Sequence, residues 1–225
     1  MENQITDTWL VIPLYNEASV IGGVIRNAVK TFPNIVCIDD GSKDGSGQIA
    51  LEAGAHLITH PVNLGQGAAL QTGIDFVVKM TDAKYLITFD ADGQHRVEDA
   101  LTMRNRAEAE DLGIVFGSRF LGQPVESGLL KRILLPLVAL VSRYRTGLKL
   151  SDAHNGLRLI RRDAASQIRL TQNRMAHASE IMNQLAGTKL PYAEQSVHIL
   201  YTDYSRSKGQ SMLNSVNILV DLILR

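Results

Sequence analysis

The sequence predicts an α/β protein in which a doubly wound, mostly parallel sheet is flanked by helices. Through the first half of the chain, short apolar runs alternate with amphipathic stretches, which is typical of parallel strands joined by helices. Acidic, basic and turn residues follow directly after four of the apolar runs. Ligands of such sheets bind beyond the carboxyl ends of the strands, so these residues are candidates for a site.

Strands and helices alternate regularly as far as residue 116. The expected strands are the apolar runs 9–12, 35–38, 56–59, 85–89 and 114–116. The expected helices between them are 19–32, 48–53, 68–80 and 97–110. Right-handed crossovers between successive strands would then build the doubly wound sheet.

The second half of the chain is less regular. We expect an amphipathic helix over 129–148 with a kink at Pro136, strands over 156–160 and 197–201, and helices over 178–185 and 212–224. No internal repeat or linker separates these segments. A single domain over 1–211 with a C-terminal helical extension over 212–225 is therefore the simplest organisation for 225 residues.

Composition narrows the classes of partner and site. Lys plus Arg equal Asp plus Glu at 23 each, so the net charge predicts no nucleic-acid partner. The single cysteine, Cys37, excludes an intrachain disulfide and a cysteine-rich zinc site. Because Cys37 lies within an apolar run, we expect a buried structural thiol.

The chain is expected to be cytoplasmic and peripheral to the membrane. Its N-terminus is polar, and its longest apolar stretch, 129–141, is interrupted by Lys131, Arg132 and Pro136. Residues 127–151 contain no acidic residue but five basic ones among many leucines: Lys131, Arg132, Arg143, Arg145 and Lys149. Such a segment could lie in the interface of an anionic membrane, or pack on the domain or on a partner subunit.

The strongest chemical feature is a pair of acidic residues directly after the fourth expected strand. Asp90 and Asp92 bracket Ala91, and two neighbouring carboxylates raise each other's pKa unless a cation lies between them. Mg²⁺ and Mn²⁺ favour hard oxygen ligands and often join a carboxylate to substrate phosphates. Gln94 could supply a further oxygen. The competing interpretation is an acidic turn with no ligand.

Two further loops fit a nucleotide. Asp39 and Asp40 end the second expected strand, where a carboxylate can accept hydrogen bonds from a base or a ribose. Residues 63–68, Asn-Leu-Gly-Gln-Gly-Ala, lead into a helix whose free N–H groups could approach a phosphate. Ordinary turn chemistry and an ordinary helix cap explain the same residues without a ligand.

Five motifs in this order resemble family 2 glycosyltransferases of the GT-A fold, especially the branch similar to dolichyl-phosphate mannose synthase. The resemblance covers roughly residues 9–210. The motifs are Pro-Leu-Tyr-Asn-Glu at 13–17, Asp-Asp-Gly-Ser at 39–42, Asn-Leu-Gly-Gln-Gly at 63–67, Asp-Ala-Asp-Gly-Gln-His at 90–95 and Gly-Ser-Arg at 117–119. Gly93 and Arg96 depart from the branch, which often has a hydrophobic residue and a proline there, so we expect a more mobile loop.

The resemblance implies a role for each matched residue. It implies nucleotide contacts by Pro13, Tyr15, Glu17, Ile38 and Asp40, and a metal site for Mg²⁺ or Mn²⁺ formed by Asp90, Asp92 and Gln94. It also implies donor or phosphate contacts by Ala91, Arg119, Arg206 and Lys208. Asp152 matches the position of a catalytic base, and Asp92 would act in catalysis through the metal. Arg206 and Lys208 match loosely and could be ordinary solvated charges. Glu180 is expected to be structural.

The implied activity is inverting transfer of a sugar from a nucleoside-diphosphate sugar to a polyprenyl phosphate. A glycosyltransferase that forms a sugar–hydroxyl bond during polysaccharide or glycolipid assembly is the alternative, because the motifs do not separate the two acceptors. A sugar-nucleotide nucleotidyltransferase and a non-catalytic binding module are weaker alternatives. A homodimer or a small membrane-protein partner would be compatible with the apolar side expected of the last helix.

Overall fold

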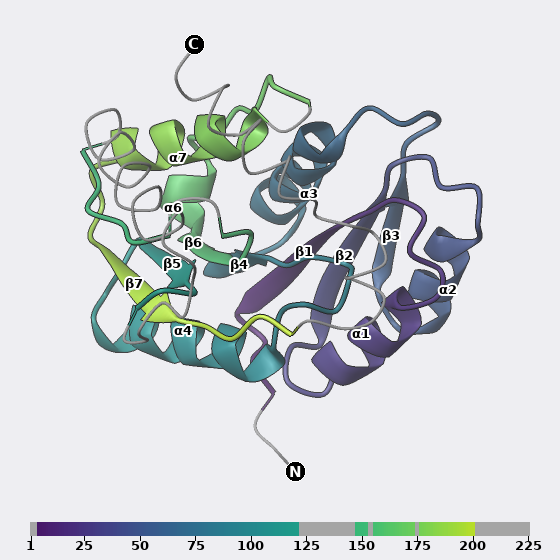
Figure 1. Cartoon of the computed structure of the whole chain (residues 1–225), viewed down its shortest axis with the longest axis horizontal. Coiled ribbons are helices and arrows are strands. Elements are labelled where there is room, and N and C mark those ends of the chain that lie inside the picture. The colour runs from purple at the N-terminus through teal and green to yellow at the C-terminus, as the bar shows by residue number, and fades with distance from the viewer. Residues whose placement is uncertain (1–3, 122–146, 153–154, 174–175, 201–225) are drawn as a thin grey trace, which may run out of the picture.

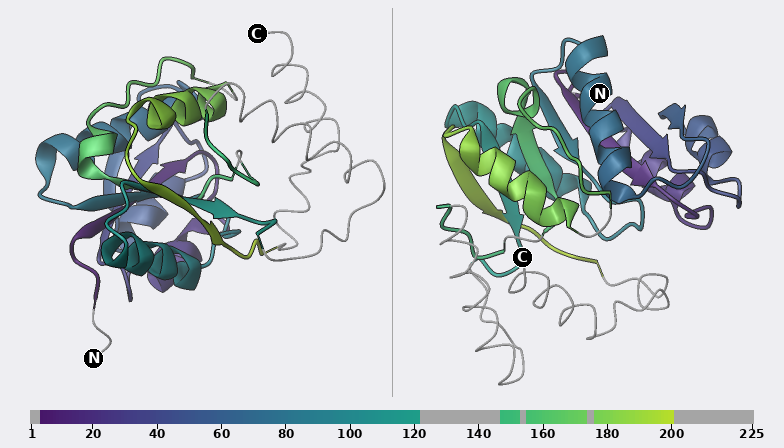
Figure 2. Two further views of the ribbon diagram at one scale, coloured as in Figure 1. Left: turned by 90° about the vertical axis from the view of Figure 1, so that its left-hand side faces the viewer. Right: turned by 90° about the horizontal axis from the view of Figure 1, so that it is seen from above.

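The structure, a computed structural model, describes residues 4–121, 147–152, 155–173 and 176–200. These residues form three layers, with a sheet between two sets of helices (Figure 1, Figure 2). The sheet has seven strands in the order β3-β2-β1-β4-β6-β5-β7. The expected α/β sheet flanked by helices is thus confirmed.

The strands pair in parallel except for one strand, which is antiparallel to both of its neighbours. β1 (Thr8–Leu14) lies between β2 (Asn34–Asp39) and β4 (Tyr85–Thr88), and β3 (His56–Thr59) extends this half. β6 (Arg158–Arg161) is antiparallel to both β4 and β5 (Ile114–Ser118), and β7 (Tyr192–Ser196) is parallel to β5. The carboxyl ends of β1, β2, β4, β5 and β7 therefore meet at one edge, as mostly parallel pairing requires.

Helices cover both faces, so the sheet contributes to two apolar cores. α1 (Ile21–Ala28), α2 (Ser46–Glu52) and α4 (Val97–Ala109) pack on one face, and α3 (Gln66–Met80), α6 (Arg162–Ala165) and α7 (His177–Gly187) lie on the other (Figure 1). Successive residues of β1 alternate between the cores: Leu10 and Ile12 join the first, Trp9 and Val11 the second. Burial on both faces explains why these strands are almost continuously apolar.

Most expected elements are present, with shifted ends, but one was wrong. Of the expected strand 197–201, the described residues 197–200 form no strand: β7 lies just before them, at Tyr192–Ser196, and Ile199 forms an isolated β-bridge with His95. β7 is an edge strand whose residues are all half-buried, so its sequence lacks the apolar run that marks a central strand. The expected helix 212–224 and most of the helix 129–148 lie outside the described residues; Gly147 and Leu148, which are described, are not helical.

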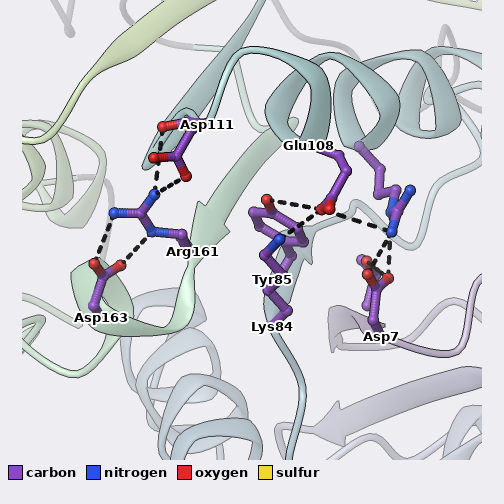
Figure 3. A network of polar contacts seen from close by, with 9 residues as sticks. Asp7, Lys84, Tyr85, Glu108, Asp111, Arg161 and Asp163 are labelled. Atoms are coloured by element: carbon purple, nitrogen blue, oxygen red, sulfur yellow. Dashed lines mark hydrogen bonds and ion pairs between the residues drawn. The ribbon is translucent and has the colours of Figure 1, made fainter.

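An ion-pair network crosses the edge of the sheet opposite to the carboxyl ends of β1 and β4 (Figure 3). Arg104 on α4 contacts Asp7 and Glu108, and Glu108 also accepts from Lys84 and from Tyr85. Separately, Arg161 joins Asp111 and Asp163 across the end of β6. The pairs made by Arg104 and Glu108 join α4 to the chain beside β1 and β4, and exposed ion pairs of this kind contribute little to stability.

Gly73 allows α3 to pack closely on the sheet, and a methyl group there is expected to destabilise the fold. A Cβ at Gly73 would lie 2.6 Å from Ile38 Cδ1 and still closer to Val11, so Gly73→Ala is expected to cost about 1–3 kcal/mol. Gly23, on the exposed side of α1, has nothing within 4 Å of its ideal Cβ, so Gly23→Ala is expected to gain about 0.5–1 kcal/mol. Urea unfolding of both variants tests this close approach, and equal gains would contradict it.

Candidate active site

A cavity of about 360 Å³ opens at the carboxyl ends of β1, β2 and β4. Its lining combines carboxylates, backbone-exposing glycine and few apolar side chains: Pro13, Leu14, Tyr15, Glu17, Asp40, Asn63, Gly65, Gln66, Ala69, Asp90, Ala91 and Asp92. These residues come from the end of β1, from the loops after β1, β2, β3 and β4, and from the start of α3. Such an edge is where open α/β sheets bind nucleotides and other small ligands.

The loop after β1 is fixed by side chains from the loop after β2. Ser42 Oγ accepts from the backbone N–H of Asn16 at 2.9 Å, and Ser46 Oγ accepts from that of Glu17 at 2.7 Å. Asn16 has a positive φ of 53°, a conformation that asparagine tolerates better than most residues. Tyr15 and Glu17 are consequently held on either side of a tight turn at the cavity wall.

Asp40 is buried, and its carboxylate is already bound by three protein donors. Oδ1 is 2.8 Å from His60 Nδ1 and accepts from Leu64 N, and Oδ2 accepts from Gly65 N at 2.7 Å. His60 Nε2 lies 2.9 Å from Thr72 Oγ1 on α3. Asp40 therefore anchors the loop before α3, and its orientation in the cavity wall is set before any ligand arrives.

Asp90 is stabilised as a carboxylate by surrounding cationic groups. Burial by itself raises its pKa, but the charge and hydrogen bond of His95, 2.9 Å away, together with Arg158 and His177, hold the pKa below the ordinary value. The backbone approaches closely here, since a Cβ at Gly156 would lie 2.6 Å from Asp90 Oδ2. Only glycine fits at residue 156 without displacing this carboxylate.

Asp92 has the opposite electrostatic environment. Burial, then the negative charge of Asp90, raise its pKa, and the N–H of Gln94 at 3.0 Å from Oδ1 offsets this only in part. Two neighbouring carboxylates therefore lie in the cavity wall, an arrangement expected where a bound cation is their counterion.

The oxygen ligands fit a divalent cation that is completed by its substrate. Within the residues that the structure describes, no group of three or more His, Cys, Asp or Glu side chains converges on one point. Mg²⁺ is often held by one or two carboxylates together with substrate phosphates rather than by an all-protein cage. Asp92 and Asp90 would hold such an ion. Gln94 contacts Asp92 through its backbone N–H, and its backbone carbonyl accepts from Leu200 N.

Arg119 and Asp152 form a second charged unit at the ends of β5 and the segment before β6. Arg119 Nε and Nη2 donate to the two carboxylate oxygens of Asp152 at 2.7 and 2.8 Å, and Arg119 N donates as well. Asp152 is only 5% exposed. Burial raises its pKa, but the hydrogen bonds and charge of Arg119 outweigh burial and hold the pKa below the ordinary value.

The structure brings together most, but not all, of the expected site residues. Pro13, Tyr15, Glu17, Asp40, Asp90, Ala91 and Asp92 line the cavity. Ile38 is fully buried beneath it, against α3, so it can act on a nucleotide only through its neighbours. Arg119 and Asp152 are paired outside the lining, and Arg206 and Lys208 lie outside the described residues. Glu180 is structural, as expected, because its carboxylate accepts from Thr171 and Gln172.

Several polar residues near the site were given no role by the sequence analysis. His60 and His95 each bind an expected site carboxylate. Arg158, on β6, is 3% exposed, and burial lowers its pKa to about 10 although Asp90 and Asp152 act in the opposite direction. Among the described residues, Arg158 Nε has no hydrogen-bond partner. The signal in the sequence that could have indicated this buried cation was Arg158 itself, an arginine within the apolar run of an expected strand.

The family model for glycosyl transferase family 2 matches residues 9–169 of the chain. The chain belongs to this family. The residues that line the cavity, including the acidic pair, and, apart from Thr8, the residues of every strand of the sheet except β7 fall within the match. The family is thus established over the part of the sequence that carries the candidate site.

Similar proteins agree with this family assignment. The chain is 27% identical over 239 residues to a UDP-N-acetylglucosamine–dolichyl-phosphate N-acetylglucosaminyltransferase of Methanococcus voltae, covering 96% of this chain and 94% of that protein. It is 30% identical over 175 residues to a polyprenol monophosphomannose synthase of Mycolicibacterium smegmatis, covering 73% and 65%. A solved structure of glucosyl-3-phosphoglycerate synthase from Mycobacterium tuberculosis, in complex with Mg²⁺ and UDP, aligns with a TM-score of 0.63 at 16% identity, covering 96% of this chain and 78% of that one. This last likeness concerns the fold.

This family 2 glycosyltransferase has no candidate membrane span among its described residues. No helix in those parts of the chain combines the length and the apolar character needed to cross a bilayer.

Proposed function

We propose that this family 2 glycosyltransferase moves a sugar from a nucleoside-diphosphate sugar to a polyprenyl phosphate, with inversion at the anomeric carbon and with Mg²⁺ or Mn²⁺. The observation that carries the proposal is the acidic pair in the wall of the cavity, where Asp90 lies beside the carboxylate of Asp92. A diphosphate could not approach this carboxylate without a cation between them. The relatives named for dolichyl and polyprenol phosphates support the acceptor class.

The cavity would hold the nucleotide half of the donor. Tyr15 is 45% exposed, and Asp40 Oδ2, which accepts one hydrogen bond from Gly65 N, would accept another from an N–H or O–H group of a base or ribose. Gly65 and Gln66, at the start of α3, lie in the same wall. The diphosphate would then extend toward Asp90 and Asp92.

The chemical step would be a direct displacement. A divalent ion held by Asp92 and Asp90 would neutralise the charge that develops on the leaving diphosphate. Arg119, oriented by Asp152, would contact a phosphate group of donor or acceptor. A phosphate monoester has its second pKa near about 6, so this acceptor is already nucleophilic at neutral pH and requires no proton acceptor from the protein. Asp152 would therefore orient Arg119 rather than remove a proton.

The acceptor suggests where the reaction takes place. A polyprenyl chain stays in a bilayer, so its phosphate is presented at a membrane surface, and the protein would bind there peripherally. The basic, leucine-rich segment 129–148 is proposed to provide this contact, on the cytoplasmic face. It lies almost entirely outside the described residues, so the proposal rests on its sequence alone.

A donor panel tests this function. Purified protein is incubated with each of several nucleoside-diphosphate sugars and Mg²⁺ or Mn²⁺, and release of nucleoside diphosphate is measured with and without undecaprenyl phosphate. We expect one donor to release nucleotide only when the lipid phosphate and the metal are both present. Release that depends on a glycan hydroxyl acceptor instead, with undecaprenyl phosphate inert, would contradict the proposed acceptor.

A further inference from the structure

Glu194 on β7 holds the backbone that carries Asp152. One carboxylate oxygen, Oε1, accepts three hydrogen bonds: from Ser151 N at 2.7 Å, from Ser151 Oγ at 2.9 Å and from Asp152 N at 3.2 Å. Glu194 and Ser151 are 43 residues apart in sequence, so the contact depends on the fold. The same oxygen thus holds two consecutive residues, Ser151 and Asp152, and the second of these binds Arg119.

The segment held by Glu194 has no regular secondary structure of its own. Residues 147–152 form neither helix nor strand, so their N–H groups take hydrogen-bond partners from elsewhere in the fold. Tyr192 supplies one through its hydroxyl, which accepts from Lys149 N at 3.0 Å. Tyr192 and Glu194 are two residues apart and therefore lie on the same face of β7. Side chains on this face of β7 therefore bind the backbone of residues 149–152.

The hydrogen bonds continue from this segment to Arg119. Ser151 Oγ lies 2.6 Å from Ser118 Oγ at the end of β5, directly before Arg119. Asp152 then binds Arg119 through both carboxylate oxygens. Glu194 is therefore connected to Arg119 by two routes, one through Asp152 and one through Ser151 and Ser118. A shift of the segment would move both ends of the ion pair together.

We propose that Glu194 is a positioning residue for sugar transfer: it fixes Asp152, and through Asp152 the guanidinium of Arg119, in the geometry that the transition state requires. The inference rests on the proposed function, because it assumes that Arg119 contacts a phosphate of donor or acceptor. Glu194 does not line the cavity, so it would act on the chemical step and not on nucleotide binding. A misplacement of about 1 Å in a reacting group can cost about 10²-fold in rate.

Glu194→Gln tests the inference, because it keeps the shape of the side chain but replaces a charged acceptor by a weaker neutral one. We expect kcat to fall about 10- to 100-fold while the KM for the donor and the Kd for nucleoside diphosphate change less than about twofold. In combination with Asp152→Asn, the second substitution should add almost nothing, since residues that act as a unit are not additive. Glu108→Gln is the matched control: it weakens ion pairs at the opposite edge of the sheet and should leave kcat unchanged.

Two outcomes would overturn the proposal: wild-type kcat in Glu194→Gln, or losses that multiply fully in the double variant. If Glu194→Gln does not fold, Ser151→Ala removes only the hydroxyl that joins Glu194 Oε1 to Ser118, and a kcat at the wild-type level would again count against the inference. The rate of the wild-type protein with undecaprenyl phosphate tests the proposed function, whereas the ratio of the variant's kcat to the wild-type kcat tests the role of Glu194. The two failures are therefore distinguishable.

Discussion

Replacing Asp92 by asparagine is expected to lower the rate of sugar transfer by about 10²–10³-fold, the largest effect of any single substitution at the site. The variant keeps the side-chain shape and the acceptor for Gln94 N but removes the charge that faces the cavity. The folded protein should not be destabilised, because the lost carboxylate was repelled by Asp90. Initial rates with the best donor and saturating Mg²⁺, alongside thermal unfolding, measure both effects.

Asp82→Asn is the matched control for this experiment. Asp82 is an exposed aspartate three residues before β4, at the other end of the strand from Asp92. Its removal changes net charge by the same amount and should leave the rate at the wild-type level. A rate within about threefold of the wild type for Asp92→Asn would show that this carboxylate holds no catalytic cation.

Asp152→Asn is expected to lower kcat by about 10²-fold, because Arg119 loses its charged partner and is no longer oriented. For a phosphate acceptor the loss should persist at high pH, since the acceptor's second pKa near about 6 leaves it ionised already. The measurement is the pH profile of kcat from about pH 6 to 9. If the activity of the variant instead rises steeply with pH, Asp152 removes a proton and the acceptor is a hydroxyl group.

The same ion pair also links stability to pH. The pKa of Asp152 in the folded protein is held below its unfolded value of about 3.9, so the pair stabilises the fold above that value. This stability is lost as the pH falls through the lowered pKa. The difference in unfolding free energy between wild type and Asp152→Asn should therefore be constant near neutral pH and shrink in acid.

The local signals in the sequence identified the half of the site that is formed by single loops. Asp90 and Asp92 follow the apolar run of β4 directly, so an abrupt change from apolar to acidic marks them without knowledge of the fold. The same holds for Asp40 after β2, which lines the same cavity. Parallel strands put their carboxyl ends at one edge, so the four apolar runs that end in acidic, basic or turn residues predicted a shared site.

The partners of these carboxylates could not be predicted, because they come from distant parts of the chain. His60 is 20 residues from Asp40, and Glu194 is 42 residues from Asp152. β6 inserts between β4 and β5 in the opposite direction, and it is this insertion that brings Arg158 near Asp90 and Asp152. β7 was misplaced because its half-buried residues have no apolar run, although its side chain at Glu194 organises the site.

The most direct test of the central claim is to locate the cation. Crystals grown with Mn²⁺ and the nucleoside diphosphate of the preferred donor are examined for the anomalous signal of manganese. The account predicts one peak in the cavity, within coordination distance of an Asp92 oxygen and of a diphosphate oxygen, with the nucleotide beside Tyr15 and Asp40. A nucleotide bound elsewhere, or one bound in the cavity with no manganese next to Asp92, would contradict it.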